Sequence, residues 1–278
     1  MKIHALQTGT VEIKKNQIIG KGPKAFRLLN VILGTQWVKP VPIYAWVIEH
    51  EEGVIVVDTG ETARTSEAGY FPRWQPYYNF AVRFQVKPEQ EIGPQLKQMG
   101  ITPKDVKKVI LTHMHTDHAG GLHHFPESKI YVNMPEYKRS HGFRGQIDGY
   151  LPHRMPKWFS PQPIEFTDGA FGSFANSWNV TIKGDVKVVP TPGHTPAHIS
   201  VVVQNEDVQY FLTGDTSYTE ENLLKKIADG VSPDPNVTVD TMQNILSFAK
   251  ERPTVYLPSH DPNSGLRLKN KTVVSKNL

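Results

Sequence analysis

Hydrophobic positions along the chain fall into short runs separated by turn residues, a pattern typical of β-strands. Two such runs, 43–50 and 54–58, are joined by Glu-Glu-Gly and predict a hairpin. We expect six further strands, at 106–112, 129–133, 185–190, 198–204, 208–214 and 254–258.

Two segments have the wider hydrophobic spacing of an α-helix. Ile92, Leu96 and Met99 recur four and three residues apart, so they share one helix face, and Gly100 ends this helix. A second helix is expected over 236–250. Because strands followed by a helix occur in both parts of the chain, we expect an α/β fold, a sandwich of two packed sheets flanked by helices. We expect one domain that covers residues 1–278.

Two long segments, 64–88 and 134–181, show no clear period and are rich in aromatic residues and proline. We interpret them as ordered loop excursions from the domain. Long loops inside a compact domain often serve as lids or binding loops, so these segments are candidates for substrate contact.

Composition narrows the function classes. The chain of 278 residues has a net charge of +4 without a dense run of lysine or arginine, so we expect no nucleic-acid partner. It has no cysteine, which excludes disulfides and thiolate zinc sites. The N-terminal segment lacks the apolar centre of a signal peptide, and the apolar runs are too short to span a bilayer. We therefore expect a cytoplasmic protein without membrane association.

Potential metal ligands are concentrated in residues 110–121, Ile-Leu-Thr-His-Met-His-Thr-Asp-His-Ala-Gly-Gly. His113, His115, Asp117 and His118 fall within six positions. In an extended segment His113 and His115 point the same way, and the small residues at 119–121 permit a tight turn. Imidazole and carboxylate groups delivered to one pocket suit a metal ion, and a surface histidine cluster is the alternative.

A metal site built on one loop needs ligands from elsewhere in the chain. His194, Asp215 and His260 each follow an apolar strand, with Gly, Pro or Ser close by. If the ends of these strands meet at one edge of the sandwich, the three side chains complete the site. Each of the three, taken alone, is equally compatible with a structural role.

In order and rough spacing, His-Met-His-Thr-Asp-His, Thr-Pro-Gly-His, Thr-Gly-Asp and Pro-Ser-His resemble the metallo-β-lactamase superfamily. Val-Val-Asp-Thr-Gly at 56–60 fits as well, and in that family Asp58 is buried beside the site and is not a ligand. The resemblance implies an αββα sandwich of two mixed sheets with two metals in one cleft. It implies a first metal held by His113, His115 and His194, a second held by Asp117, His118 and His260, and Asp215 bridging both.

The resemblance also implies a reaction class. Two cations about 3.5–4 Å apart share a water and lower its pKa towards about 7, so that hydroxide attacks an electrophilic centre. We therefore expect a hydrolase with two divalent metal ions. Zinc is the default, and the same ligands accept Mn, Fe or Co.

One stretch favours a branch of the superfamily. Gly-Asp-Thr-Ser-Tyr-Thr-Glu-Glu-Asn, 214–222, resembles the N-acyl homoserine lactonases, which degrade a bacterial quorum signal. By that resemblance Tyr218 hydrogen-bonds the oxyanion as the lactone opens, and Asp117 passes a proton to the leaving alkoxide. Ala197 stands where this branch is expected to have glycine. His198 is interpreted as structural or as a neighbour of the site.

An acyl-lactone substrate needs an apolar groove for its tail. We expect Phe71 and Trp74, together with Tyr218, to contact substrate. Other aromatic candidates are Tyr70, Tyr77 and Phe80 in the first excursion and Trp158 and Phe159 in the second. The alternative for these aromatic residues is the core or a dimer interface, and exposed aromatic loops are compatible with a homodimer.

Other hydrolases on the same site remain alternatives to the lactonase. They are a thioesterase of glyoxalase II type, a generic lactonase and a phosphodiesterase. A non-catalytic metal-binding protein is a third class, which a site closed on all sides would favour.

Overall fold

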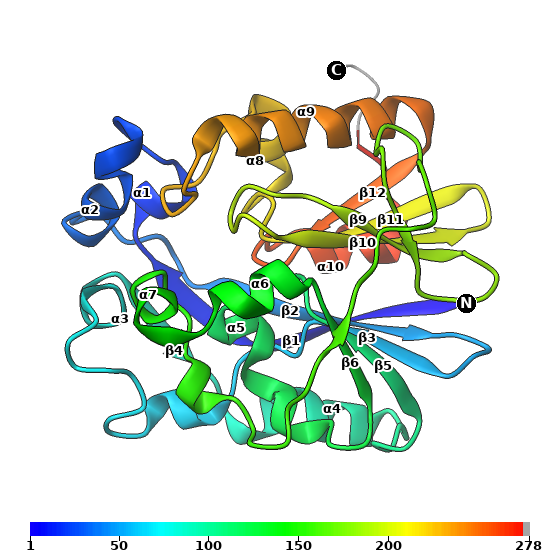
Figure 1. The fold of residues 1–278 in the computed structure, drawn as a ribbon, viewed down its shortest axis with the longest axis horizontal. Helices are drawn as coiled ribbons and strands as arrows, with labels where there is room; N and C mark the ends of the chain where they lie inside the picture. The colour runs from blue at the N-terminus through cyan, green and yellow to red at the C-terminus, as the bar shows by residue number, and fades with distance from the viewer. Residues whose placement is uncertain (275–278) are drawn as a thin grey trace.

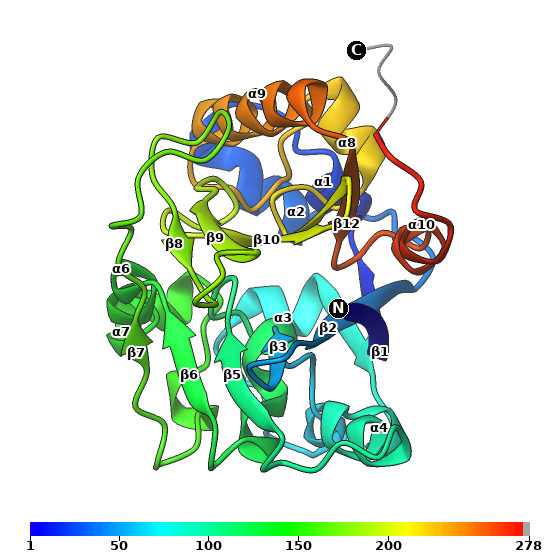
Figure 2. The same cartoon turned by 90° about the vertical axis from the view of Figure 1, so that its right-hand side faces the viewer.

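Two β-sheets pack face to face with helices on both outer sides in the computed structural model, which describes residues 1–274 (Figures 1 and 2). The first sheet has seven strands in the order β4 (Val82–Gln85), β1 (Lys2–Ile13), β2 (Val41–Glu49), β3 (Val54–Val57), β5 (Val106–Ile110), β6 (Lys129–Val132), β7 (Gln162–Pro163). The second has five in the order β12 (Thr254–Pro258), β11 (Val208–Gly214), β10 (Ile199–Asn205), β9 (Val186–Pro190), β8 (Trp178–Asn179).

Both sheets are mixed, as the αββα sandwich requires. β2 and β3 form the predicted antiparallel hairpin, whereas β3, β5 and β6 run parallel to one another. In the second sheet β11 and β12 are also parallel. Parallel neighbours end at the same edge of a sheet, so the residues that follow them are delivered to one place.

Side chains alternate between two apolar layers along the central strands. In β10, Val201 and Val203 belong to the core between the sheets, together with Val57 and Ile110 of the first sheet. Val202 points the other way, into the layer beneath helix α9. Because both faces are covered, these strands read as continuous apolar runs.

The two predicted helices cover the outer faces (Figure 2). α4 (Ile92–Gln98) buries Ile92 and Leu96 against the seven-stranded sheet. α9 (Pro235–Glu251) buries Met242 and Ile245 against the five-stranded sheet. The Asp234 carboxylate accepts a hydrogen bond from the Asn236 N–H and caps the start of α9.

Several elements were not predicted. They are the strands β1, β4, β7 and β8, the helices α1 (Lys15–Ile18), α2 (Arg27–Ile32), α3 (Pro76–Phe80), α5 (Thr116–Ala119), α6 (Met134–Arg139), α7 (Gly142–Ile147), α8 (Glu220–Lys225) and α10 (Ser264–Asn270), and the short 3-10 helices η1 (Lys24–Phe26), η2 (Ala63–Ser66), η3 (Pro88–Gln90), η4 (Gly120–His124) and η5 (Pro152–Arg154).

The segments 64–88 and 134–181 contain regular structure and join the sheets. The first supplies α3 and the edge strand β4, and the second supplies α6, α7 and the two-residue edge strands β7 and β8. Such short elements are too brief to show a hydrophobic period. Among the described residues, no helix has both the length and the apolar character needed to cross a membrane.

Candidate metal centre

The histidine-rich loop begins where the central strand β5 ends. His113 and His115 follow β5, and His115, whose backbone is extended, is the N-cap of α5, whose first turn carries Asp117 and His118. The 3-10 helix η4, which follows α5 directly, lies close to the segment after β3. A Cβ atom on Gly121 would lie only 2.3 Å from the Thr59 carbonyl oxygen, so the small residue is required there.

Three further side chains reach this loop from the second sheet. His194 follows β9, Asp215 directly follows β11, and His260 follows β12. All three are buried. The structure therefore brings the three remote residues to the loop, as the sequence predicted from the ends of their strands.

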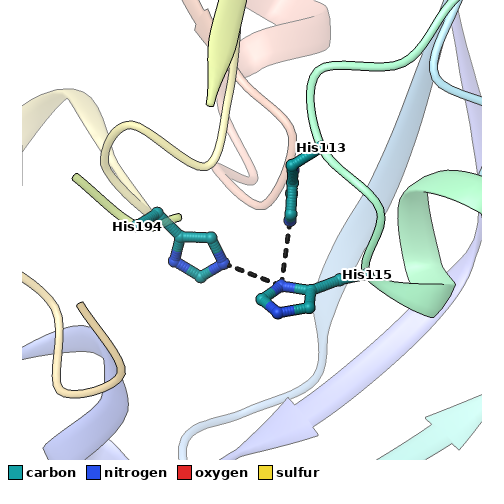
Figure 3. A group of neighbouring side chains, drawn as sticks. All are labelled: His113, His115 and His194. Carbon is teal, nitrogen blue, oxygen red and sulfur yellow. Dashed lines mark hydrogen bonds between the residues drawn. The ribbon is translucent and has the colours of Figure 1, made fainter. Parts of the chain in front are cut away.

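His113, His115 and His194 form one group (Figure 3). The Nδ1 atom of His115 lies 3.0 Å from Nε2 of His113 and 3.1 Å from Nε2 of His194. Two ligand nitrogens on one tetrahedral zinc ion are about 3.3 Å apart, given zinc–nitrogen distances of about 2.0–2.1 Å. The three nitrogens thus have a spacing close to that of ligands around one cation.

Asp215 lies between this group and a second one. Its Oδ2 atom is 3.5 Å from Nε2 of His194. Its Oδ1 atom is 3.3 Å from Nε2 of both His118 and His260. The Oδ2 atom of Asp117 lies 3.4 Å from the same nitrogen of His260. One carboxylate therefore faces two ligand groups, which is the geometry needed to bridge two cations.

Oxygen atoms hold the outward-facing nitrogens of the imidazole rings. Nδ1 of His118 lies 2.8 Å from Oδ2 of Asp58, and Nδ1 of His260 lies 2.8 Å from the Pro42 carbonyl oxygen. Since these oxygens accept hydrogen bonds, each outward nitrogen carries a proton, and the inward nitrogen is the one that faces the ligand groups. The neighbouring carboxylates raise the pKa of His118 well above its usual value and that of His260 to about 10, so a metal would displace a proton from each inward nitrogen.

The same arrangement recurs for two of the other histidines. Nδ1 of His194 lies 3.3 Å from Oδ2 of Asp229, and Nε2 of His115 lies 3.3 Å from the Asp148 carbonyl oxygen. His115 therefore presents Nδ1 to the centre, whereas the other rings present Nε2. These contacts fix ring orientation before any ligand binds.

Asp58 is fully buried beside the site and outside the ligand groups, as the resemblance implied. It accepts hydrogen bonds from the backbone N–H and the hydroxyl of Thr112 at 2.8 and 2.9 Å. Its φ angle of 57° lies in the left-handed region, which costs a residue with a side chain about 1–3 kcal/mol. The bonds to Thr112 and His118 offset this strain and hold the carboxylate in place.

Two buried polar atoms without partners, and the lowered pKa values of two histidines, indicate that the central ligand groups suit a cation. Nε2 of His118 and Oδ1 of Asp215 are buried without a hydrogen-bond partner among the described residues. Such atoms destabilise a fold unless they are paired. Burial and the neighbouring imidazoles lower the pKa of His115 to about 4 and that of His113 well below its usual value. Both are therefore neutral at pH 7, the state that binds metal.

His198 lies next to the ligands and positions one of them. Its Nε2 atom accepts a hydrogen bond from the Asp215 N–H at 3.2 Å, and its Nδ1 atom lies 2.9 Å from the Thr191 hydroxyl. Burial, with a contribution from His194, lowers its pKa to about 3. His198 is thus a neutral neighbour of the site, in agreement with one of the two sequence-based interpretations.

A pocket opens onto the ligand groups. Its polar side includes His115, Asp117 and His260, and much of its wall is apolar, with contributions from Val11, Ile13, Leu28, Val82 and Phe84. Tyr218 also lines it, with its ring stacked on His260 at a centroid distance of 5.5 Å.

The sequence did not single out Gln17, which holds the Tyr218 hydroxyl. The Gln17 side-chain amide donates to Tyr218 Oη at 2.7 Å and to Tyr77 Oη at 2.8 Å. Asp229, the partner of His194, was missed as well. Gln17 lies 201 residues from Tyr218, so no local sequence signal relates the two.

The predicted substrate contacts Phe71 and Trp74 do not line the pocket. Phe71 stacks behind it on Tyr78 and Phe84, with ring centroids 4.5 and 5.7 Å away. Trp74 lies at the surface beside Phe143. Of the other aromatic candidates, Tyr77 lines the pocket, whereas Tyr70, Phe80, Trp158 and Phe159 do not. The aromatic-rich segment 64–88 does contribute Tyr77 to the pocket wall. Which of its side chains face the pocket depends on how α3 and β4 pack.

Comparison with known proteins agrees with this geometry. The family model of the metallo-beta-lactamase superfamily matches residues 38–260. The N-acyl homoserine lactonase AiiA of Bacillus thuringiensis subsp. kurstaki is 29% identical over 234 residues, which are 80% of this chain and 82% of the relative. The N-acyl homoserine lactonase AttM of Agrobacterium fabrum is 27% identical over 278 residues, with 97% and 96% of the two chains covered.

A solved structure shares the fold. It is an N-acyl homoserine lactone hydrolase with the product N-hexanoyl-L-homoserine at its catalytic metal centre, and it aligns with a TM-score of 0.72 at 22% identity, over 98% of this chain and 96% of its own. The family of this chain implies a divalent metal, and the histidine and aspartate groups agree with that. The chain belongs to the metallo-β-lactamase superfamily and is a hydrolase similar to the N-acyl homoserine lactonases of that superfamily.

Proposed function

We propose that this protein opens the lactone ring of N-acyl homoserine lactones by hydrolysis, with two divalent metal ions, zinc by default. The observation that carries the proposal is the position of Tyr218. Its ring stacks on His260 and lines the same pocket as Asp117 and Asp215. The resemblance of residues 214–222 to the lactonases and the relatives reported above support it.

The metal ligands that we propose follow the two groups seen in the structure. His113, His115 and His194 would hold one ion, and Asp117, His118 and His260 the other, with Asp215 between them. When bound, the ions would polarise the substrate carbonyl and lower the pKa of a shared water.

Asp117 is placed to move a proton. It lines the pocket, and its side chain is 16% exposed, more than those of Asp215 and His260. Burial opposes its ionisation, but His260 and His118 outweigh this and lower its pKa, so it is a carboxylate at neutral pH. In the proposed reaction a water oxygen adds to the lactone carbonyl carbon and the ring C–O bond breaks. Asp117 takes the water's proton and delivers it to the leaving alkoxide.

Tyr218 has a free proton for the developing oxyanion. Its oxygen already accepts a hydrogen bond from Gln17, so its own O–H is left to donate into the pocket. Burial and Asp215 raise its pKa well above the usual value, which keeps it protonated. A donor aimed where negative charge develops lowers the barrier more than it aids substrate binding.

The apolar wall provides room for an acyl tail. Val11, Ile13 and Phe84 come from β1 and β4, on the side of the pocket formed by the first sheet. These replace Phe71 and Trp74 as the proposed contacts of the tail. A single domain over residues 1–278, a cytoplasmic location and a homodimer stay predictions.

A turnover screen tests the proposal. Protein with measured metal content is assayed against N-acyl homoserine lactones of short, medium and long tails, a simple lactone, a thioester and a bis-aryl phosphate. We expect hydrolysis of acyl homoserine lactones with the highest kcat/KM of the panel. Metal-loaded protein that cleaves the thioester or the phosphate instead would assign the site to that chemistry.

A further inference from the structure

A second group of metal-binding side chains lies beside helix α4, away from the pocket. His123 and His124 at the end of η4 both point at Glu91, the N-cap residue of α4. The Nε2 atoms of His124 and His123 lie 2.7 and 3.1 Å from the same oxygen, Oε2 of Glu91. The three donor atoms are within 4.8 Å of one another, and none of these residues lines the pocket.

Glu91 is held so that this oxygen faces the histidines. Its other oxygen, Oε1, accepts hydrogen bonds from the Thr62 hydroxyl at 3.0 Å and the Ala63 N–H at 2.8 Å. The carboxylate therefore cannot turn without breaking two bonds. A carboxylate fixed in this way is a preorganised ligand.

Both ring nitrogens of His123 face oxygen atoms, so a positive charge on or beside the ring would stabilise this arrangement. Its Nδ1 atom lies 3.2 Å from the Gly120 carbonyl oxygen, an acceptor, so Nδ1 carries a proton. A neutral imidazole has one ring proton, which leaves a lone pair on Nε2 facing the Glu91 oxygen. Two lone pairs at that distance repel each other. Either a second proton on His123 or a metal cation beside Nε2 removes the repulsion.

His124 is packed in a way that favours the metal. Burial lowers its pKa, as does the neighbouring His123, and the opposing effect of Glu91 does not restore it. Its ring lies over Gly93, where a Cβ atom would come within 2.4 Å of Nδ1. This packing holds the ring 4.0 Å from the ring of His123, and the lowered pKa favours the neutral imidazole that binds metal.

We propose that Glu91, His123 and His124 form a separate binding site for a divalent transition-metal ion, with two imidazole nitrogens and one carboxylate oxygen as ligands. The side chains of His123, His124 and Glu91 are 42%, 22% and 10% exposed, so an ion can enter from solvent. Imidazole suits Zn²⁺, Ni²⁺ and Cu²⁺ better than Ca²⁺ or Mg²⁺. The site ties the end of η4 to the start of α4. η4 in turn continues α5, which carries Asp117 and His118.

Zinc titration tests this site without reference to lactone turnover. Protein loaded with Zn²⁺ at the central groups and desalted is titrated with Zn²⁺ by calorimetry, and bound zinc is counted by mass spectrometry. We expect the unaltered protein to bind one more zinc per chain than a His123→Gln/His124→Gln variant. Each single substitution should weaken this binding about 10-fold or more, the scale seen when a supporting contact of a metal is lost.

The matched control is His4→Gln. His4 also pairs with a glutamate, Glu49, but without a second imidazole, so this variant should keep the extra zinc. Circular dichroism checks that the variants are folded. If the double variant does not fold, the single variant His123→Gln takes its place, because His123 is exposed and its replacement should not disturb the fold. Equal zinc content and affinity in the unaltered protein and the folded variants would overturn the proposal. The absence of extra zinc in the unaltered protein would also overturn it, because a second proton on His123 would then provide the positive charge beside Glu91.

Discussion

Two groups of histidines in this protein differ in how their rings are held. In the central group, each outward ring nitrogen has its own oxygen partner, such as Asp58 for His118 and Asp229 for His194. In the group beside α4, His123 and His124 share one oxygen of Glu91. The central rings are buried except that of His115, which is partly buried, and the peripheral rings are partly exposed.

This difference teaches where rigidity comes from. The central ligands arrive from both sheets, and His118, His194 and His260 are fixed by oxygen atoms that lie far away in the sequence. The peripheral ligands come from one short turn and one helix cap. Substitutions in the central ligand groups should therefore impair metal binding, activity or stability more than substitutions in the group beside α4. The experiments below run from the largest expected effect to the smallest.

Asp215→Ala should disrupt the central group most severely. Its carboxylate faces both ligand groups, so its removal takes one ligand oxygen from each of them. We expect bound metal at the central groups to be lost and lactone turnover to fall by at least about 100-fold, more than the loss of a supporting contact causes. Metal counting and steady-state kinetics measure this. Asp207→Ala, in the exposed turn after β10, is the control and should keep both.

Tyr218→Phe should separate chemistry from metal binding. Removal of one oxyanion donor lowers kcat by about 100-fold, with metal content unchanged. Tyr256→Phe is the matched control, because the hydroxyl of that buried tyrosine bonds Ser217 and does not line the pocket. A Tyr218→Phe enzyme with normal kcat contradicts the role proposed for the hydroxyl.

Asp229→Asn tests whether the outward contacts matter. Asp229 holds Nδ1 of His194, and loss of such a partner typically weakens metal binding about 10–100-fold. Competition with a chelator of known affinity measures the change. Ser232→Ala removes another contact of the same carboxylate and should leave metal affinity within a few-fold. If both variants behave alike, Asp229 stabilises its loop and does not tune His194.

Gln17→Leu should have a smaller effect than Tyr218→Phe. Without the Gln17 amide the Tyr218 hydroxyl keeps its proton but loses its orientation. The lost hydrogen bond is worth about 1 kcal/mol, so we expect kcat to fall by about 5-fold with KM little changed. Tyr77→Phe, which removes the other hydroxyl bonded to Gln17, serves as the comparison. A rise in KM alone would place Gln17 in substrate binding instead.

His123→Gln should have the smallest effect on stability. In the presence of chelator, its exposed pair with Glu91 contributes about 1 kcal/mol or less to the free energy of unfolding. Urea unfolding monitored by tryptophan fluorescence measures this. The central counterpart, His118→Gln, leaves buried Asp58 without its partner and should cost about 3 kcal/mol or more. Equal losses would contradict the contrast between the two groups.

Much of the fold followed from hydrophobic periodicity. The central strands β5, β10, β11 and β12 were predicted close to their observed bounds, because they are continuous apolar runs. Helices α4 and α9 were also predicted closely, because apolar residues recur on one face of each. Strand β1 was missed, since polar residues interrupt it and its paired residues in β2 lie thirty or more positions away in the sequence. The edge strands β4, β7 and β8 are defined by their neighbours and not by their own residues.

The sequence by itself indicated which side chains could bind metal at the central groups, because dense histidine and aspartate motifs at strand ends are a local property, but it did not single out Glu91, His123 and His124. Only the tertiary structure decided which atoms face one another, as the two oxygens of Asp215 show. It alone also brought Gln17 to Tyr218 and Asp229 to His194, and turned Phe71 and Trp74 away from the pocket. The physical reason is that periodicity records burial, whereas hydrogen-bond partners and pocket walls depend on how distant segments pack.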